Sequence, residues 1–141
     1  MAYLLDTNVI SELRKRTPHG AVLAWIQKIP EESLYTSAVT IGEIQAGIEI
    51  TREQDEAKAA EIEQWLDELA QTHNVLDVSA AIFRRWARLM HRRAAHHLED
   101  ALIAATALTH DLTVATRNVR DFKPLGVDLI NPFIAVQKRR S

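Results

Sequence analysis

The sequence predicts an α/β fold in which helices cover a central parallel sheet. Short apolar runs typical of buried strands alternate with amphipathic helical segments from one end of the chain to the other. No internal repeat, linker or low-complexity segment interrupts this alternation, and a length of 141 residues is usual for one domain. Residues 1–141 are therefore expected to fold as a single domain, and the ordinary content of 47% hydrophobic and 26% charged residues supports this.

The first half of the chain brings two acidic residues to the starts of helices. Asp6 directly follows the first apolar run, Pro30 stops the second helix, and Glu43 falls in the first turns of the third. The expected elements are a strand at 3–5, a helix over 9–13, a helix over 22–29, a strand at 34–36 and a helix over 40–48.

The second half continues the pattern with longer helices. The charged, alanine-rich text from Arg52 to Gln71 predicts one amphipathic helix, Ser79 suits the N-cap of the next helix, and Asp100 opens the one after that. The expected elements are a helix over 52–71, a strand at 75–78, a helix over 80–90, a helix over 99–110, a strand at 112–116, a polar loop over 116–122 and a strand at 127–130.

The composition excludes several classes of protein. The absence of cysteine rules out disulfides, thiolate metal sites and a cysteine nucleophile, so a metal must be held by oxygen or imidazole ligands. No apolar run approaches the roughly 20 residues of a membrane helix, which predicts a cytoplasmic protein without a signal peptide. The glycines form no phosphate-binding motif, which disfavours NAD and ATP. A net charge of −2 argues against strong non-specific binding of polyanions, although a local basic face remains compatible with it.

Several acids are expected to converge at the carboxyl edge of the sheet, where open α/β folds bind their ligands. Asp6 follows a strand, and Glu43 and Asp100 lie in early helix turns that face the same edge. Crowded carboxylates favour a hard divalent cation, Mg²⁺ or Mn²⁺, and such a site suits phosphodiester hydrolysis by water. Each acid alone also fits an ordinary capping role, and helical spacing does not decide between Glu99 and Asp100.

Three strings, LLDTNVISEL, SAVTIGEIQAGI and EDALIAATALTHDLTVATRNVRDF, together resemble the PIN-domain family, particularly its VapC- and FitB-like toxins. They span nearly the whole chain, and their order and spacing make the combination specific. The resemblance implies a Rossmann-like α/β/α sandwich and a Mg²⁺-dependent ribonuclease. It carries the motif acids over as Asp6, Glu43 and Asp100, with Asp6 and Asp100 as metal ligands. It prefers Asp100 to Glu99, because the acid directly before ALIAATA is the ligand in this family.

Two positions, Asn118 and Asp121, are candidates for the fourth residue that completes the site. Some relatives carry Asp where this chain has Asn118, which leaves Asp121 as the available carboxylate. We expect Asp121 to assist catalysis, while Asn118 and Thr116 are able to hydrogen-bond a metal-bound water. Asn8 is expected to orient Asp6 or its loop.

The resemblance also implies partners. The chain is expected to be the toxin of a type II toxin–antitoxin pair, to cut RNA, to bind a small cognate antitoxin and to form homodimers and larger assemblies. One alternative is a non-catalytic regulator with the same fold that binds RNA or an antitoxin. Another is a phosphatase of the haloacid dehalogenase type, but such enzymes need a second Asp at the position of Asn8.

A basic stretch follows Ser79 and contains no acid before Glu99. Two interpretations stay open, namely contact with RNA phosphates beside the acidic site and an ordinary solvated helix face. The tryptophans fall on apolar helical stripes and are expected in the core or a dimer interface, whereas adjacent His96 and His97 are expected at a solvated surface. The basic residues are Arg84, Arg85, Arg88, His91, Arg92, Arg93, His96 and His97.

Overall fold

The computed structural model describes residues 1–94 and 98–134, and its strands form one parallel sheet. The strand order is β3-β2-β1-β4-β5, with β1 at the centre, and every neighbouring pair is parallel. The predicted α/β class is therefore confirmed. The strands are β1 Tyr3–Leu5, β2 Leu34–Ser37, β3 Asn74–Leu76, β4 Thr113–Ala115 and β5 Leu129–Ile130.

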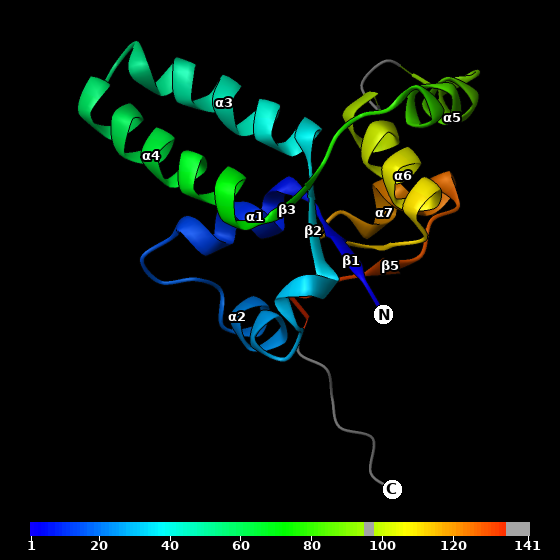
Figure 1. The fold of residues 1–141 in the computed structure, drawn as a ribbon, viewed down its shortest axis with the longest axis horizontal. Helices are drawn as coiled ribbons and strands as arrows, with labels where there is room; N and C mark the ends of the chain where they lie inside the picture. The colour runs from blue at the N-terminus through cyan, green and yellow to red at the C-terminus, as the bar shows by residue number, and fades with distance from the viewer. Residues whose placement is uncertain (95–97, 135–141) are drawn as a thin grey trace, which may run out of the picture.

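The helices form a layer on each face of the sheet, with the α3–α4 hairpin and the α5–α6 pair standing out as two arms (Figure 1). Short 3₁₀ turns precede β2 and follow α7. His96 and His97 lie outside the described residues. The helices are α1 Thr7–Arg14, α2 Gly20–Gln27, α3 Ala38–Arg52, α4 Glu56–Thr72, α5 Ala80–Met90, α6 Leu98–His110 and α7 Val119–Phe122.

The central strand separates two hydrophobic cores because successive side chains of a strand point to opposite faces. Tyr3 and Leu5 pack in the core that α1, α2, α3 and α4 share. Leu4 faces the other core, which is built mainly from α6, α7 and the turn after it. This arrangement is the α/β/α sandwich that the resemblance to the PIN-domain family implies. Among the described residues, no helix combines the length and apolar character needed to cross a lipid bilayer.

The predicted helix over 52–71 is wrong at its start. Arg52 is the last residue of α3, and α4 begins only at Glu56. The Asp55 side chain caps α4 by accepting a hydrogen bond from the amide of Lys58 at 3.0 Å. Arg52 then binds carboxylates on both helices, at 3.0 Å from Glu49 on α3 and at 2.7 Å from Glu56 and 3.1 Å from Glu63 on α4, so it ties the α3–α4 hairpin together.

The expected polar loop over 116–122 contains the short helix α7. Four residues are too few to show a helical period, so the sequence pattern carries no signal for this element. The buried Phe122 anchors α7 in the core beside α6. The predicted strands at 75–78, 112–116 and 127–130 are each one or more residues longer at an end than β3, β4 and β5.

Asp111 ends α6 in a left-handed conformation with φ 56°, which glycine adopts without strain. The amide of Leu112 donates to the carbonyl of Ala107 at 2.8 Å and closes this turn. We therefore expect Asp111→Gly to raise the free energy of unfolding by about 0.5 kcal/mol in urea titrations. Asp67→Gly, on the exposed side of α4, should lower it instead. Destabilisation by both substitutions would contradict this explanation of the turn.

Candidate active site

Asp6 lies at the carboxyl end of the central strand and caps α1. Its backbone amide donates to the carbonyl of Ala115 at 2.9 Å, which holds it against the neighbouring strand β4. Its Oδ1 accepts from the amide of Thr7 at 2.8 Å. Its Oδ2 accepts from the Thr116 hydroxyl at 2.8 Å and from Nδ2 of Asn8 at 3.2 Å. The carboxylate is therefore held in one orientation from three directions.

The environment of Asp6 disfavours its charged form. The residue is only 6% exposed, and this burial raises the pKa of the Asp6 carboxyl. Hydrogen bonds from Thr116, Thr7 and Asn8 partly oppose the rise in pKa, while the negative charge of Glu99 adds to it. Asp6 is thus a buried acid whose ionisation a nearby cation would favour.

Glu43 reaches the same place from α3. Ser37, at the end of β2, starts this helix by accepting from the amide of Val39 at 3.1 Å. Because β2 lies beside β1, the second turn of α3 comes next to the start of α1. The Thr7 hydroxyl donates to Oε2 of Glu43 at 3.1 Å, so Thr7 links the two acids through its amide to Asp6 and its hydroxyl to Glu43.

The pKa of Glu43 is raised to about 7. Burial is the largest cause, and the negative charges of Glu99, Asp6 and Asp100 also raise it, while the hydrogen bond from Thr7 acts in the opposite direction. Glu43 therefore changes its charge near neutral pH.

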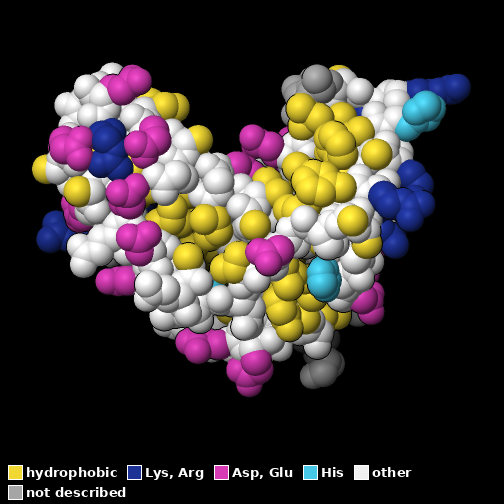
Figure 2. Space-filling view, turned by 45° about the horizontal axis from the view of Figure 1, so that its top comes forward, with side chains coloured by type: hydrophobic (Ala, Val, Ile, Leu, Met, Phe, Trp, Pro, Cys, Tyr) yellow, Lys and Arg dark blue, Asp and Glu magenta, His cyan; other side chains and the backbone are white. Residues whose placement is uncertain are grey.

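The start of α6 adds two acids to this cluster. Asp100 is half-buried and raises the pKa of Glu43, whereas Glu99 is exposed and raises the pKa of both Asp6 and Glu43. Helical spacing left Glu99 and Asp100 as equal candidates and the family resemblance preferred Asp100, so the effect of the Glu99 charge on Asp6 was not predicted. We call Asp6, Glu43, Glu99 and Asp100 the acidic cluster. Acidic side chains gather in the notch between the two helical arms (Figure 2).

Asp121 differs from the other predicted site residues. It lies exposed in α7. The segment after β4 contributes Thr116 instead, whose hydroxyl accepts from the amide of Asn118 at 2.9 Å while donating to Asp6. Asn8 also reaches this segment, because its Oδ1 accepts from the amide of Arg117 at 3.2 Å.

The donor set suits a hard divalent cation such as Mg²⁺ or Mn²⁺. The acidic cluster offers carboxylate oxygens, and mutual repulsion contributes to the raised pKa of Glu43, a repulsion that a cation would relieve. Among the described residues, neither Asp6 nor Glu43 forms an ion pair. Within residues 1–94 and 98–134, no three His, Asp or Glu side chains are already arranged as a complete metal-binding group. The chemistry of the donors therefore supports a metal site, and its ligands stay a prediction.

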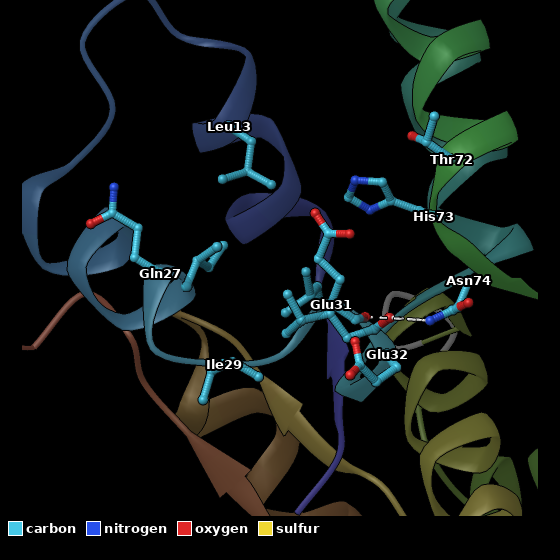
Figure 3. Close-up of a pocket in the computed structure, with 11 residues that line it drawn as sticks. Leu13, Gln27, Ile29, Glu31, Glu32, Thr72, His73 and Asn74 are labelled. Atoms are coloured by element: carbon cyan, nitrogen blue, oxygen red, sulfur yellow. Dashed lines mark hydrogen bonds between the residues drawn. The ribbon is translucent and has the colours of Figure 1, made fainter.

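A separate pocket of about 630 Å³ lies between α1, α2 and the end of α4. Glu31 points toward His73 across this pocket (Figure 3). Burial lowers the pKa of His73, and the charge of Glu31 opposes that effect. None of the predicted site acids lines this pocket. The sequence pattern did not predict this pocket, because the residues that line it are far apart along the chain.

Thr116 and Thr36 allow a matched test of how Asp6 is held. Both are fully buried, but Thr116 donates to Asp6 whereas Oγ1 of Thr36 has no hydrogen-bond partner. We expect Thr116→Val to lower the free energy of unfolding by about 1 to 2 kcal/mol and any metal-dependent activity by about 10- to 100-fold. Thr36→Val should be neutral or stabilising. Chemical unfolding measures the stability of both valine variants, and Thr116→Ser should be as stable as the unaltered protein.

The chain matches the PIN domain family model over residues 3–126. It is 39% identical over 140 residues to VapC ribonuclease Y4jK of Sinorhizobium fredii, covering 92% of this chain and 96% of that protein. It is 32% identical over 136 residues to toxin FitB of Neisseria gonorrhoeae, covering 92% and 97%.

Solved structures agree with this assignment. The crystal structure of FitAcB from Neisseria gonorrhoeae contains a chain that matches with a TM-score of 0.76 and 30% identity, covering 93% of this chain and 98% of that one. A chain of FitAB bound to a DNA fragment matches with a TM-score of 0.80 and 28% identity, covering 98% and 99%. The parallel sandwich, the acids at its carboxyl edge and these matches show that the chain belongs to the PIN domain family, among the relatives of VapC and FitB.

Proposed function

We propose that the chain is a metal-dependent endoribonuclease and the toxin of a type II toxin–antitoxin pair. The observation that carries this proposal is the acidic cluster, in which Asp6 is buried and Glu43 has a pKa of about 7 at the carboxyl edge of the sheet. The names of the relatives, VapC ribonuclease and toxin FitB, support the same activity. We propose that all 141 residues act as one domain in the cytoplasm.

In the proposed mechanism, Asp6 and Asp100 would hold Mg²⁺ or Mn²⁺. The ion, when bound, would offset the charge of the scissile phosphate and make a bound water more acidic. The hydrogen bonds from Thr7, Asn8 and Thr116 hold the Asp6 carboxylate in place, so it does not have to reorganise when substrate arrives.

Glu43 is the proposed general base. Its pKa of about 7 lets a carboxylate oxygen accept a proton from water at neutral pH, and the Thr7 hydroxyl orients Oε2. As the water oxygen bonds to phosphorus, the bond to the leaving oxygen breaks, and that oxygen takes a proton from solvent. Asp121 lies exposed near this edge and is proposed to assist only after substrate has bound.

The proposed partners follow from the family. Several similar structures are toxin–antitoxin complexes, including FitAB and VapBC-1 of Haemophilus influenzae. We propose that this chain likewise binds a small antitoxin and forms a homodimer and larger assemblies. We propose that its substrate is RNA.

The test is to incubate the purified, antitoxin-free protein with total cellular RNA in Mg²⁺, in Mn²⁺ and in EDTA, and to map new 5′ ends. We expect discrete cuts that require metal and disappear in Asp100→Asn. Folding of each protein is checked by thermal unfolding. If a folded wild-type protein binds RNA in EDTA but cuts it with neither metal, the nuclease proposal is wrong and a non-catalytic regulator replaces it.

A further inference from the structure

The outward side of α5 carries a concentration of positive charge. Arg84 and Arg88 are exposed and lie one turn apart, on the same face of the helix. Arg92 is exposed in the turn after α5. The buried Ile82 faces the core from the other side of the helix. We call Arg84, Arg88 and Arg92 the arginine face.

The arginine face is not used to hold the fold together. In the described ranges 1–94 and 98–134, ion pairs involve Lys15 and Arg52 but no residue of α5. Arg93, by contrast, is engaged, since it donates to the carbonyls of Leu89 at 2.6 Å and Pro124 at 3.0 Å. Within the part of the chain that the structure describes, the guanidinium groups of these three arginines make no ion pair or hydrogen bond, in a chain whose net charge is −2.

The arginine face and the acidic cluster lie on opposite sides of α5. Nε1 of Trp86, in the middle of α5, donates to the carbonyl of Leu98 at 3.2 Å. Leu98 is the first residue of α6, and the next residue is Glu99, whose charge acts on Asp6 and Glu43. Trp86 lies about half a turn around α5 from Arg84 and Arg88, so these arginines point away from α6. Packed helices lie about 8–10 Å apart, so RNA that contacts both the face and the cluster has to cross over α5. Lys and Arg side chains gather on the outer side of this arm (Figure 2).

We propose that the arginine face binds the phosphate backbone of the RNA substrate on one side of the cut. This inference rests on the proposed function, because it assumes that the acidic cluster acts on RNA. A cluster of carboxylates repels a polyanion, so attraction must come from a neighbouring surface. Guanidinium groups pair with phosphates in a forked geometry, and a row of them follows a sugar–phosphate chain. This surface recognises charge and not base sequence.

The test measures binding and cleavage separately. The probe is fluorescein-labelled, unfractionated transfer RNA in EDTA, titrated with protein at several salt concentrations. For R84Q/R88Q/R92Q we expect affinity to fall about tenfold or more, and the slope of log affinity against log salt to become shallower by about 2 to 3. R84K/R88K/R92K keeps the charges and should keep the slope. Thermal unfolding checks that each variant folds.

The matched control is R14Q/R16Q/K58Q, which removes the same charge from exposed positions on and beside α1 and on α4. It should bind RNA almost as tightly as the unaltered protein. An equal loss in this control would show an effect of net charge and overturn the inference. So would unchanged RNA affinity in R84Q/R88Q/R92Q, or a loss confined to a double-stranded DNA probe.

Cleavage in Mg²⁺ distinguishes the two proposals. If the protein cuts RNA in the presence of metal but the arginine substitutions do not change its RNA affinity, this inference is overturned and the nuclease proposal stands. If the arginine substitutions lower RNA affinity but the unaltered protein cuts no RNA, the inferred binding surface stands and the nuclease proposal is wrong. A wild-type protein that neither binds nor cuts RNA would overturn both.

Discussion

Asp6→Asn should reduce RNA cleavage by about 1,000-fold or more in single-turnover assays with Mg²⁺. The substitution removes one of the two carboxylates proposed to hold the ion and leaves a neutral amide of the same shape. Folding should survive, because Asn caps a helix as well as Asp does. The raised pKa of Asp6 also means that its charge does not stabilise the fold at neutral pH.

The control for Asp6 is Asp128→Asn, which makes the same chemical change at an exposed position before β5. Its cleavage rate should stay close to that of the unaltered protein. Thermal unfolding of both variants separates lost chemistry from lost structure. A folded Asp6→Asn protein that cuts RNA at the normal rate would remove Asp6 from the mechanism.

Glu43→Gln should lower the cleavage rate by about 100- to 10,000-fold, the usual contribution of a general base. It should also stabilise the metal-free protein at alkaline pH. The pKa of Glu43 in the folded protein, about 7, lies above its ordinary value of 4.5, so folding becomes less favourable as pH rises through that window. We expect a gain of about 1 kcal/mol at about pH 8, because partial exposure of Glu43 weakens the effect, and no gain at about pH 4.

Urea unfolding in EDTA at the two pH values measures this difference. Glu61→Gln, at an exposed position on α4, is the matched control and should change the stability little at either pH. Adding Mg²⁺ at alkaline pH should stabilise the unaltered protein more than the Glu43→Gln variant. A variant that is less stable than the unaltered protein at about pH 8 would contradict the raised pKa.

The fold follows from the sequence wherever a pattern is long enough to carry it. The central strand at Tyr3–Leu5 and the helix after Ser79 are predicted correctly, since each has a strong apolar pattern and a clear boundary. The errors arise where the pattern is ambiguous. Asp55 starts α4 inside a run of charged residues that reads as one helix, and α7 is too short to have a period.

The site is predictable in part for a related reason. The ends of parallel strands and the starts of helices meet at one edge, which is how Asp6 and Glu43 come together through Thr7. The effect of Glu99 on both acids depends on the position of α6 relative to β1, and helical spacing alone contains no information on that position. The exposure of Asp121 depends in the same way on α7, which the sequence pattern did not reveal.

The hydrogen bond from the amide of Asp6 to the carbonyl of Ala115 has a consequence for hydrogen exchange. This amide lies between the two central strands, so it should exchange only when the whole domain unfolds. The tip of the α3–α4 hairpin, near Arg52 and Glu56, extends from the body and should open more readily, whereas Glu43 lies at the base of the hairpin in the second turn of α3 (Figure 1). Local opening of the hairpin tip therefore leaves both Asp6 and Glu43 in place, and the acids of the site should come apart only when the fold itself unfolds.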